Sequence, residues 1–208
     1  MDVATPIRSV IPGVTGVILQ VLARTEQPLT GVRIAELTDG RASRPGVNKA
    51  LKALVASGVV GCQRAGAANL YRLNRQHVAA DAVLALSDLR GVALRRATEL
   101  VGSWALPPVA VWLFGSAARS DGGVDSDVDL LVVRAATVRE DDSLWNEQTM
   151  ALTENVHAWT GNHCDVIEYT EDQLGELVVQ HDALVAELQR DAITISGPSA
   201  RELLRSRP

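Results

Sequence analysis

The sequence of 208 residues predicts a fold of mixed helices and strands, α/β in the broad sense and α+β in particular. Two folded parts are joined by a helical segment. The first part combines helical apolar periodicity with two short β-like runs, and the second contains a continuous apolar run typical of a buried strand. Charge also separates along the chain. Residues 1–76 carry ten Lys/Arg and four Asp/Glu, whereas residues 77–208 carry ten and twenty-one. The charge split indicates a basic module suited to polyanions and an acidic module suited to cations.

Composition excludes several classes of protein. A hydrophobic content of 47% and a charged content of 22% are ordinary for a globular protein and exclude extensive disorder. No apolar run approaches the length needed to span a membrane, so we expect no membrane partner. Cys62 and Cys164 lie far apart and provide neither a disulfide framework nor zinc-ligand spacing. We expect a cytoplasmic protein.

The first 75 residues show the pattern of three helices followed by a hairpin. Residues 14–24 are predicted to form a helix, because their apolar side chains share one helical face. A short second helix is predicted over residues 30–37, with Thr30 as its N-cap. A third helix starts at Ser43-Arg44-Pro45 and ends near Gly58. Two β-like runs follow, over residues 59–64 and 69–73. This order predicts a winged helix-turn-helix domain over residues 1–75.

The third helix and the strand after it resemble those of winged-helix DNA-binding domains of bacterial regulators, over about residues 12–75. The likeness rests on NKALKAL at residues 48–54 and on Ser57-Gly58-Val59-Val60. It implies a helix that enters the major groove of DNA, or that binds another nucleic acid, and a homodimer would read paired half-sites. A solvated face that holds a partner protein is the alternative. The predicted DNA-binding residues are polar or basic and lie off the apolar stripe: Arg41, Arg44, Asn48, Lys49, Lys52 and Arg64.

Residues 76–104 are rich in Ala, Leu and Val at helical spacing, which predicts a helical connector. Gly91 is the predicted division between two helices of this connector. Pro107-Pro108 then punctuates the chain before the apolar run, so the second domain is predicted over residues 105–208.

Residues 109–133, VAVWLFGSAARSDGGVDSDVDLLVV, contain the chemistry-bearing pattern. An apolar strand breaks at Gly115-Ser116, and a polar segment leads to Asp127-Val128-Asp129 at the start of a second strand. Alternate residues of a strand share a face, so Asp127 and Asp129 are predicted to project together. Because two adjacent carboxylates repel, a hard divalent cation is their expected neutraliser. A turn and strand start without a metal is the alternative.

A third carboxylate is predicted at Asp165. A helix over residues 143–160 precedes a strand over residues 164–169, and Asp165 lies near the start of that strand between apolar residues. Glu168 has the opposite strand parity and should face away. Thr170 caps a further helix, and a helix over 183–189, a strand over 192–196 and a basic helix close the chain. These strands predict a small mixed sheet.

The strand, Gly115-Ser116, the spacer and Asp-x-Asp together resemble the signature of the DNA polymerase beta-like nucleotidyltransferases, in particular the minimal bacterial and archaeal ones, over about residues 105–198. Ser120 departs mildly, since many relatives have Gly there. The resemblance implies NTP, such as ATP, as substrate and Mg²⁺ or Mn²⁺ as cofactor. The implied roles fall on the matching positions: Gly115, Ser116 and Arg119 bind nucleotide, and Asp127, Asp129 and Asp165 bind metal and act in catalysis.

The expected reaction moves a nucleoside monophosphate from an NTP to an acceptor, which is a protein, an RNA or a small molecule such as an antibiotic. Two alternatives stay open on the sequence alone. One is a winged-helix transcriptional regulator whose nucleotidyltransferase domain senses nucleotide or is inactive. The other is one member of a toxin–antitoxin pair.

Overall fold

The computed structural model describes residues 1–119, 122–123 and 126–205. Ser120, the departure from the family pattern, lies outside the described residues. Among the helices that this part of the chain forms, none combines the length and hydropathy that crossing a bilayer would require.

Contacts divide the chain between Arg90 and Gly91, inside the region predicted as a helical connector. The N-terminal unit comprises Asp2 and Ala4–Arg90, and the C-terminal unit comprises Met1, Val3 and Gly91–Pro208.

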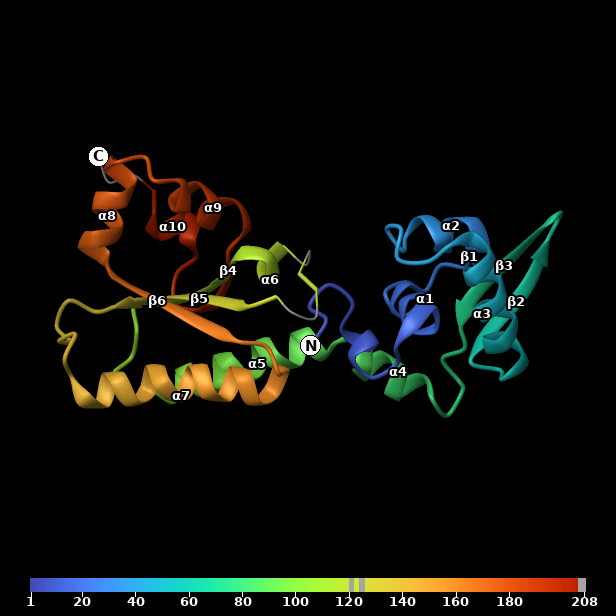
Figure 1. Ribbon diagram of the computed structural model, residues 1–208, viewed down its shortest axis with the longest axis horizontal. Coiled ribbons are helices and arrows are strands. Elements are labelled where there is room, and N and C mark those ends of the chain that lie inside the picture. Colours follow the sequence, from blue (N-terminus) through green and yellow to red (C-terminus); the bar gives the residue numbers. More distant parts are fainter. Residues whose placement is uncertain (120–121, 124–125, 206–208) are drawn as a thin grey trace. The chain divides into compact units, whose positions relative to one another are not determined.

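The N-terminal unit is a set of helices packed on a small antiparallel sheet (Figure 1). Its sheet has the order β1-β3-β2, and its core includes Ile18, Ile34 and Leu51, all fully buried. The elements are η1 (Pro6–Ser9), α1 (Gly13–Ala23), β1 (Leu29–Thr30), α2 (Gly31–Glu36), α3 (Arg44–Ala56), β2 (Val60–Ala65), β3 (Ala68–Leu73) and α4 (Ala80–Ser87).

The predicted helix starts in this unit are confirmed by their caps. The Thr30 hydroxyl accepts a hydrogen bond from the Arg33 backbone N–H at 3.1 Å, and Ser43 accepts one from Gly46 at 3.3 Å. These bonds satisfy N–H groups that the first helical turn leaves without a partner. Gly58 follows α3 with φ +77°, the left-handed conformation that ends a helix. Strand β1 was not predicted, because two residues are too few to show a periodicity.

The C-terminal unit is built around a four-stranded mixed sheet of order β6-β5-β4-β7. Strands β5 and β6 run parallel, and β4 is antiparallel to both of its neighbours, so the predicted α+β class with a mixed sheet is confirmed. The elements are α5 (Leu89–Gly102), β4 (Ala110–Phe114), α6 (Gly115–Arg119), β5 (Val128–Arg134), α7 (Ser143–Thr160), β6 (Cys164–Thr170), α8 (Glu171–Val179), α9 (Ala183–Asp191), β7 (Ile193–Ser196) and α10 (Ala200–Leu203).

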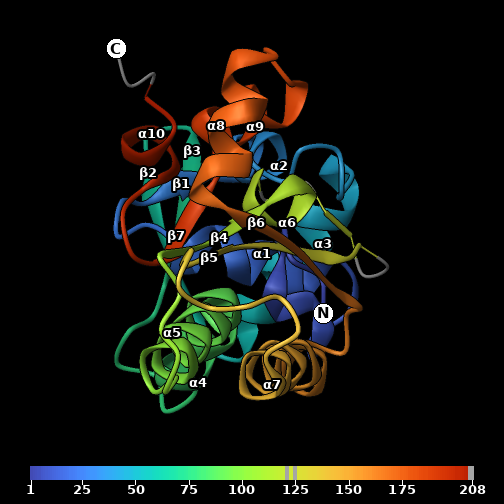
Figure 2. The ribbon, with the colours of Figure 1, turned by 90° about the vertical axis from the view of Figure 1, so that its left-hand side faces the viewer.

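Helices cover both faces of this sheet, as Figures 1 and 2 show. On one face, α5 and α7 bury Trp145 and Leu152 against Leu130 of β5. On the other, α8, α9 and α10 bury Leu174 and Leu188 against Trp112 and Leu131. Burial of large apolar side chains on both faces accounts for the long apolar runs in β4 and β5.

The prediction that Gly91 separates two connector helices is wrong. Helix α5 begins at Leu89 and runs through Gly91, and the break falls at Asp88, which ends α4. Gly lowers the stability of a helix interior by about 1 kcal/mol relative to Ala, which the surrounding helix can tolerate. Composition alone therefore placed the break three residues too late.

Candidate active site

Asp129 and Asp165 are brought together by the pairing of β5 and β6. The parallel register aligns Asp129 directly with Asp165 near the start of both strands. On the other side of β5, Asp129 is paired with Phe114, the last residue of β4. Because side chains at aligned positions project from the same face, both carboxylates lie on the face that α8 and α9 cover.

Asp127 lies just before this sheet. Strand β5 begins at Val128, so Asp127 precedes the strand that the sequence predicted it to open. Its side chain is exposed, and the side chain of Asp165 is 56% exposed. Asp129, which lies between these two residues in the sequence, is half-buried.

The electrostatics of Asp129 favour an added positive charge. Burial raises the pKa of the Asp129 carboxyl, and the negative charges of Asp127, Asp165 and Glu187 raise it further. Arg119 acts in the opposite direction and lowers the pKa of Asp129. Carboxylate oxygens are the donors that Mg²⁺ prefers, so the donor set fits a hard divalent cation. Among the described residues, no three His, Cys, Asp or Glu side chains converge closely enough to enclose a metal by themselves.

Gly115 is required by the close approach of its backbone to Asp129. Its φ of +68° is in the left-handed region, which favours glycine. A Cβ atom at this position would collide with Asp129 Oδ2 and lie 3.2 Å from Asp129 Cγ. Gly115, where the sequence predicted the break of the strand, starts the five-residue helix α6, and the half-buried Ser116 follows it.

Arg119, at the end of α6, is held by two carboxylates of α9. Its Nη1 lies 2.8 Å from Glu187 Oε1 and 3.9 Å from Asp191 Oδ2. Sequence analysis did not predict these two acids at the site. They stand one helical turn apart, but nothing in the local sequence of α9 shows that it packs beside α6.

Two hydrogen bonds fix the segment that carries Asp127. The Val128 N–H donates to the His163 carbonyl at 2.8 Å, and the Asn162 side-chain amide donates to the Ser126 carbonyl at 2.8 Å. Asn162 is only 3% exposed. Asn162 lies between the predicted helix over residues 143–160 and the predicted strand over residues 164–169, and no local pattern indicates a contact with Ser126, so this role was missed. His163 itself lies beside Asp165, with Nδ1 3.4 Å from Oδ1.

Glu168 faces the opposite side of the sheet, as its strand parity predicted. Its Oε2 accepts a hydrogen bond from the Trp145 indole N–H at 2.7 Å, and its Oε1 forms an ion pair with Arg134. These partners belong to the α5 and α7 face. Glu168 is therefore separated by the sheet from Asp129 and Asp165.

Cys164 is buried next to Asp165, and burial, followed by the charges of Asp165 and Asp129, raises the pKa of its thiol to about 12. Cys62 is exposed.

We expect a chromogenic disulfide reagent at pH 8 to modify one thiol in the folded protein and the second only after unfolding. A Cys62→Ser variant should then show no rapidly reacting thiol. Because folding disfavours the Cys164 thiolate, this group should lower the stability as the pH rises from 9.0 towards 12. Rapid modification of Cys164 in Cys62→Ser would contradict its burial.

The residues predicted to bind DNA lie on the surface of the N-terminal unit. Four of them are on α3, with one on the preceding loop and one on β2, and Arg41 forms an ion pair with Asp39 at 3.8 Å. A Cβ on Gly31 would lie 3.2 Å from Asn48 Oδ1, so Asn48 lies against the start of α2. All six are exposed: Arg41, Arg44, Asn48, Lys49, Lys52 and Arg64.

Comparison with known proteins was made for sequence families, curated proteins and solved structures. No curated protein shows a significant match to the chain. One solved structure, described as "Crystal structure of the toxin-antitoxin with AMP-PNP", is similar over 53% of this chain and 79% of that chain, with 17% identity and a TM-score of 0.37. Residues 96–190 match the model of a family described as a nucleotidyltransferase domain. The match spans every residue predicted to bind nucleotide or metal, and it supports a transferase.

Proposed function

We propose that the chain is a Mg²⁺-dependent nucleotidyltransferase that moves a nucleoside monophosphate from an NTP to an acceptor. The observation that carries this proposal is the alignment of Asp129 with Asp165 in adjacent strands, next to a Gly115 backbone that only glycine can form there. Asp127, Asp129 and Asp165 would hold Mg²⁺, and Mn²⁺ suits the same oxygen donors. Gly115, Ser116 and Arg119 would bind the triphosphate.

The proposed reaction joins an acceptor oxygen or nitrogen to the α-phosphorus of the NTP. The bond from that phosphorus to the oxygen bridging to the β-phosphate breaks, and pyrophosphate leaves with its electron pair. Asp165, which is more exposed than Asp129, accepts the proton of the acceptor. Gly115 lets the backbone approach the phosphates, the Ser116 hydroxyl donates to a phosphate oxygen, and Arg119 neutralises phosphate charge. Bound Mg²⁺ would stabilise the charge that develops on the phosphates.

Transfer is tested by incubating the full chain with Mg²⁺, host lysate and NTP labelled at either the α- or the γ-phosphate. We expect label from the α-phosphate alone in the product, and none with Asp127→Ala/Asp129→Ala. Equal labelling by the wild type and this variant would refute the assignment. Binding of NTP without transfer to any acceptor would instead favour a nucleotide-sensing regulator.

The ion pair of Arg119 supports a competition between α9 and the triphosphate. If Arg119 binds phosphate, Arg119→Ala should raise KM for NTP by about 10- to 100-fold, the effect of losing one hydrogen bond to a charged group. Glu187→Gln should lower KM by about threefold, because it removes the nearer of the two carboxylates that pair with Arg119 and a negative charge near Asp129. Steady-state kinetics at varied NTP measure both. A higher KM in Glu187→Gln would show that Glu187 orients Arg119 for phosphate instead of competing for it.

We also propose that residues 1–75 form a winged-helix domain that binds DNA, followed by a connector over 76–104 and the nucleotidyltransferase domain over 105–208. The exposed polar face of α3 supports this proposal. Asn48→Ala/Lys52→Ala should weaken binding to a duplex DNA fragment by about 10- to 100-fold, and binding should fall steeply with salt. Gel shifts measure the affinity, with Arg139→Ala in the C-terminal unit as the control. Salt-insensitive binding that survives the double substitution would contradict this docking.

A further inference from the structure

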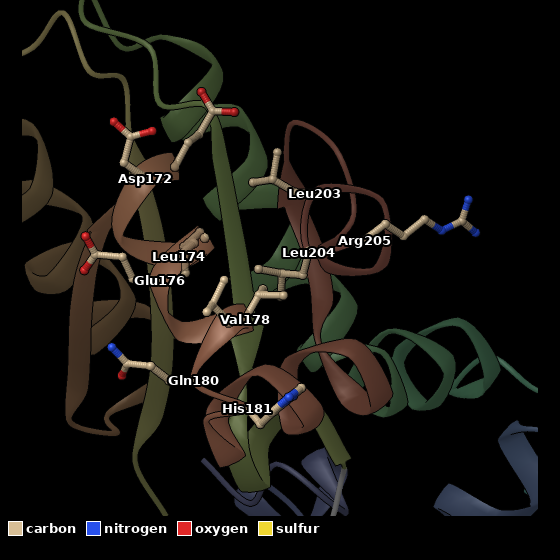
Figure 3. Close-up of a pocket in the computed structure, with 12 residues that line it drawn as sticks. Asp172, Leu174, Glu176, Val178, Gln180, His181, Leu203, Leu204 and Arg205 are labelled. Carbon is tan, nitrogen blue, oxygen red and sulfur yellow. The ribbon is translucent and has the colours of Figure 1, made fainter. Parts of the chain in front are cut away.

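An apolar groove lies between α8 and the end of α10, apart from the acids of the proposed site. It has a volume of about 730 Å³ (Figure 3). Leu174 and Val178 of α8 form one wall, and Leu203 and Leu204 form the other. Leu174 and Leu204 are each 2% exposed and belong to the core, so the accessible apolar surface of these walls comes from the half-buried Val178 and Leu203.

The groove continues onto exposed apolar surface at the end of α8. Val179 lines it and is 79% exposed, although it follows the half-buried Val178. A valine this exposed, contiguous with an apolar groove, gains free energy when another apolar surface covers it.

The α8 side of the groove is acidic. Glu171, Asp172 and Glu176 line it, and Figure 3 shows the carboxylates of Asp172 and Glu176 directed away from the apolar residues. Arg205, just after α10, and His181, just after α8, are the basic residues among the lining residues that the structure describes. The charge of the groove is therefore divided, with three carboxylates on the α8 side and Arg205 on the α10 side.

The groove is distant from the proposed chemistry along the sheet. Helix α8 starts directly after Thr170, the last residue of β6, whereas Asp165 lies near the first. Five strand residues span about 17 Å. An occupant of the groove therefore need not contact the metal or the triphosphate.

We propose that this groove binds the apolar face of a basic amphipathic helix from a partner protein. Apolar side chains of such a helix, spaced at i, i+3, i+4 and i+7, would cover Val178, Val179 and Leu203. Its Lys or Arg residues would lie against the carboxylates of Asp172 and Glu176. The nine residues of α8 extend over about 13 Å, which matches two to three turns of an incoming helix. The acidic rim disfavours nucleic acid as the occupant.

The probe is a synthetic helix of about 14 residues with Leu on one face and Lys on the other. Two further peptides complete the set: the same residues in a scrambled order, and the amphipathic order with Glu in place of Lys. Fluorescence anisotropy with the full chain measures their affinities. We expect the amphipathic Leu/Lys peptide to bind about tenfold more tightly than either of the other two peptides. The affinity of the Leu/Lys peptide should fall at high salt.

Two substitutions on the surface of the groove test the site without disturbing the core. Val179→Asp and Glu176→Lys should each weaken binding of the Leu/Lys peptide by about tenfold. Glu147→Lys, an exposed charge reversal on α7 on the opposite face of the sheet, should leave the affinity unchanged. Equal binding of the scrambled peptide, or an equal effect of Glu147→Lys, would overturn the proposal. So would a dimer of the chain that Val179→Asp dissociates, because a second copy would then occupy the groove.

Discussion

Replacing Asp129 with Asn is expected to lower the rate of nucleotidyl transfer by about 10³-fold or more, because a metal ligand of this kind supplies several kcal/mol of transition-state stabilisation. The same substitution should make the metal-free protein more stable. Asn keeps the shape of the side chain and removes a charge that burial and the neighbouring acids disfavour. Loss of activity with a gain of stability distinguishes a functional acid from a structural one.

The pH dependence of this stability difference follows from the raised pKa of Asp129. Below the ordinary value of 3.8, the carboxyl is protonated in the folded and unfolded chain, and wild type and Asp129→Asn should be equally stable. As the pH rises through 3.8 and then through the raised folded pKa, the unfolded chain loses its proton first, so the wild type becomes the less stable protein. Urea unfolding at several pH values without metal measures the difference, and added Mg²⁺ should stabilise only the wild type.

Glu147→Gln on the exposed side of α7 is the matched control, since it also neutralises one acid of this unit. It should leave transfer activity and the response to Mg²⁺ unchanged. If Asp129→Asn were instead less stable than the wild type at neutral pH, Asp129 would serve mainly as a hydrogen-bonding residue of the fold.

The parts of the fold that depend on residues close together in the sequence could be predicted. Thr170 caps α8 by a capping box with Gln173, and Gly161 ends α7 at φ +73°, because caps and left-handed ends need particular residue types at fixed offsets. Strand parity, which is also local, separated Glu168 from Asp165 correctly. The break at Asp88 was missed because no such local signal marks it.

The parts of the site that come from distant elements could not be predicted. Glu187 reaches Arg119 across a separation of 68 residues, and Asn162 reaches the Ser126 carbonyl across 36. These contacts depend on how α9 and the α7–β6 loop pack, which a single sequence does not encode in any local pattern. The alignment of Asp129 with Asp165 depends likewise on the β5–β6 register. The catalytic roles of these acids stay predictions.

Replacing Gly115 with Ala tests the contact between the predicted nucleotide-binding turn and the predicted metal ligand. The substitution imposes a side chain on a residue at φ +68° and drives its Cβ into Asp129 Oδ2, so the turn or the carboxylate must move. Backbone strain of this kind costs about 1–3 kcal/mol, and we expect a loss of stability in that range. Displacing Asp129 should also lower transfer activity by about 100-fold, since small errors of position at a reacting centre have effects of this size.

Gly102→Ala provides the control within the same unit. Gly102 ends α5, and a Cβ there would meet nothing within 4 Å, so this variant should retain wild-type activity and stability. Thermal unfolding and transfer of α-labelled NMP measure both proteins. The double variant Gly115→Ala/Asp129→Asn should lose less activity than the product of the two single losses, because Gly115→Ala acts partly through the position of the Asp129 carboxylate and partly through the proposed approach of the backbone to the phosphates. Losses that multiply in full would mean that Gly115→Ala does not act through Asp129.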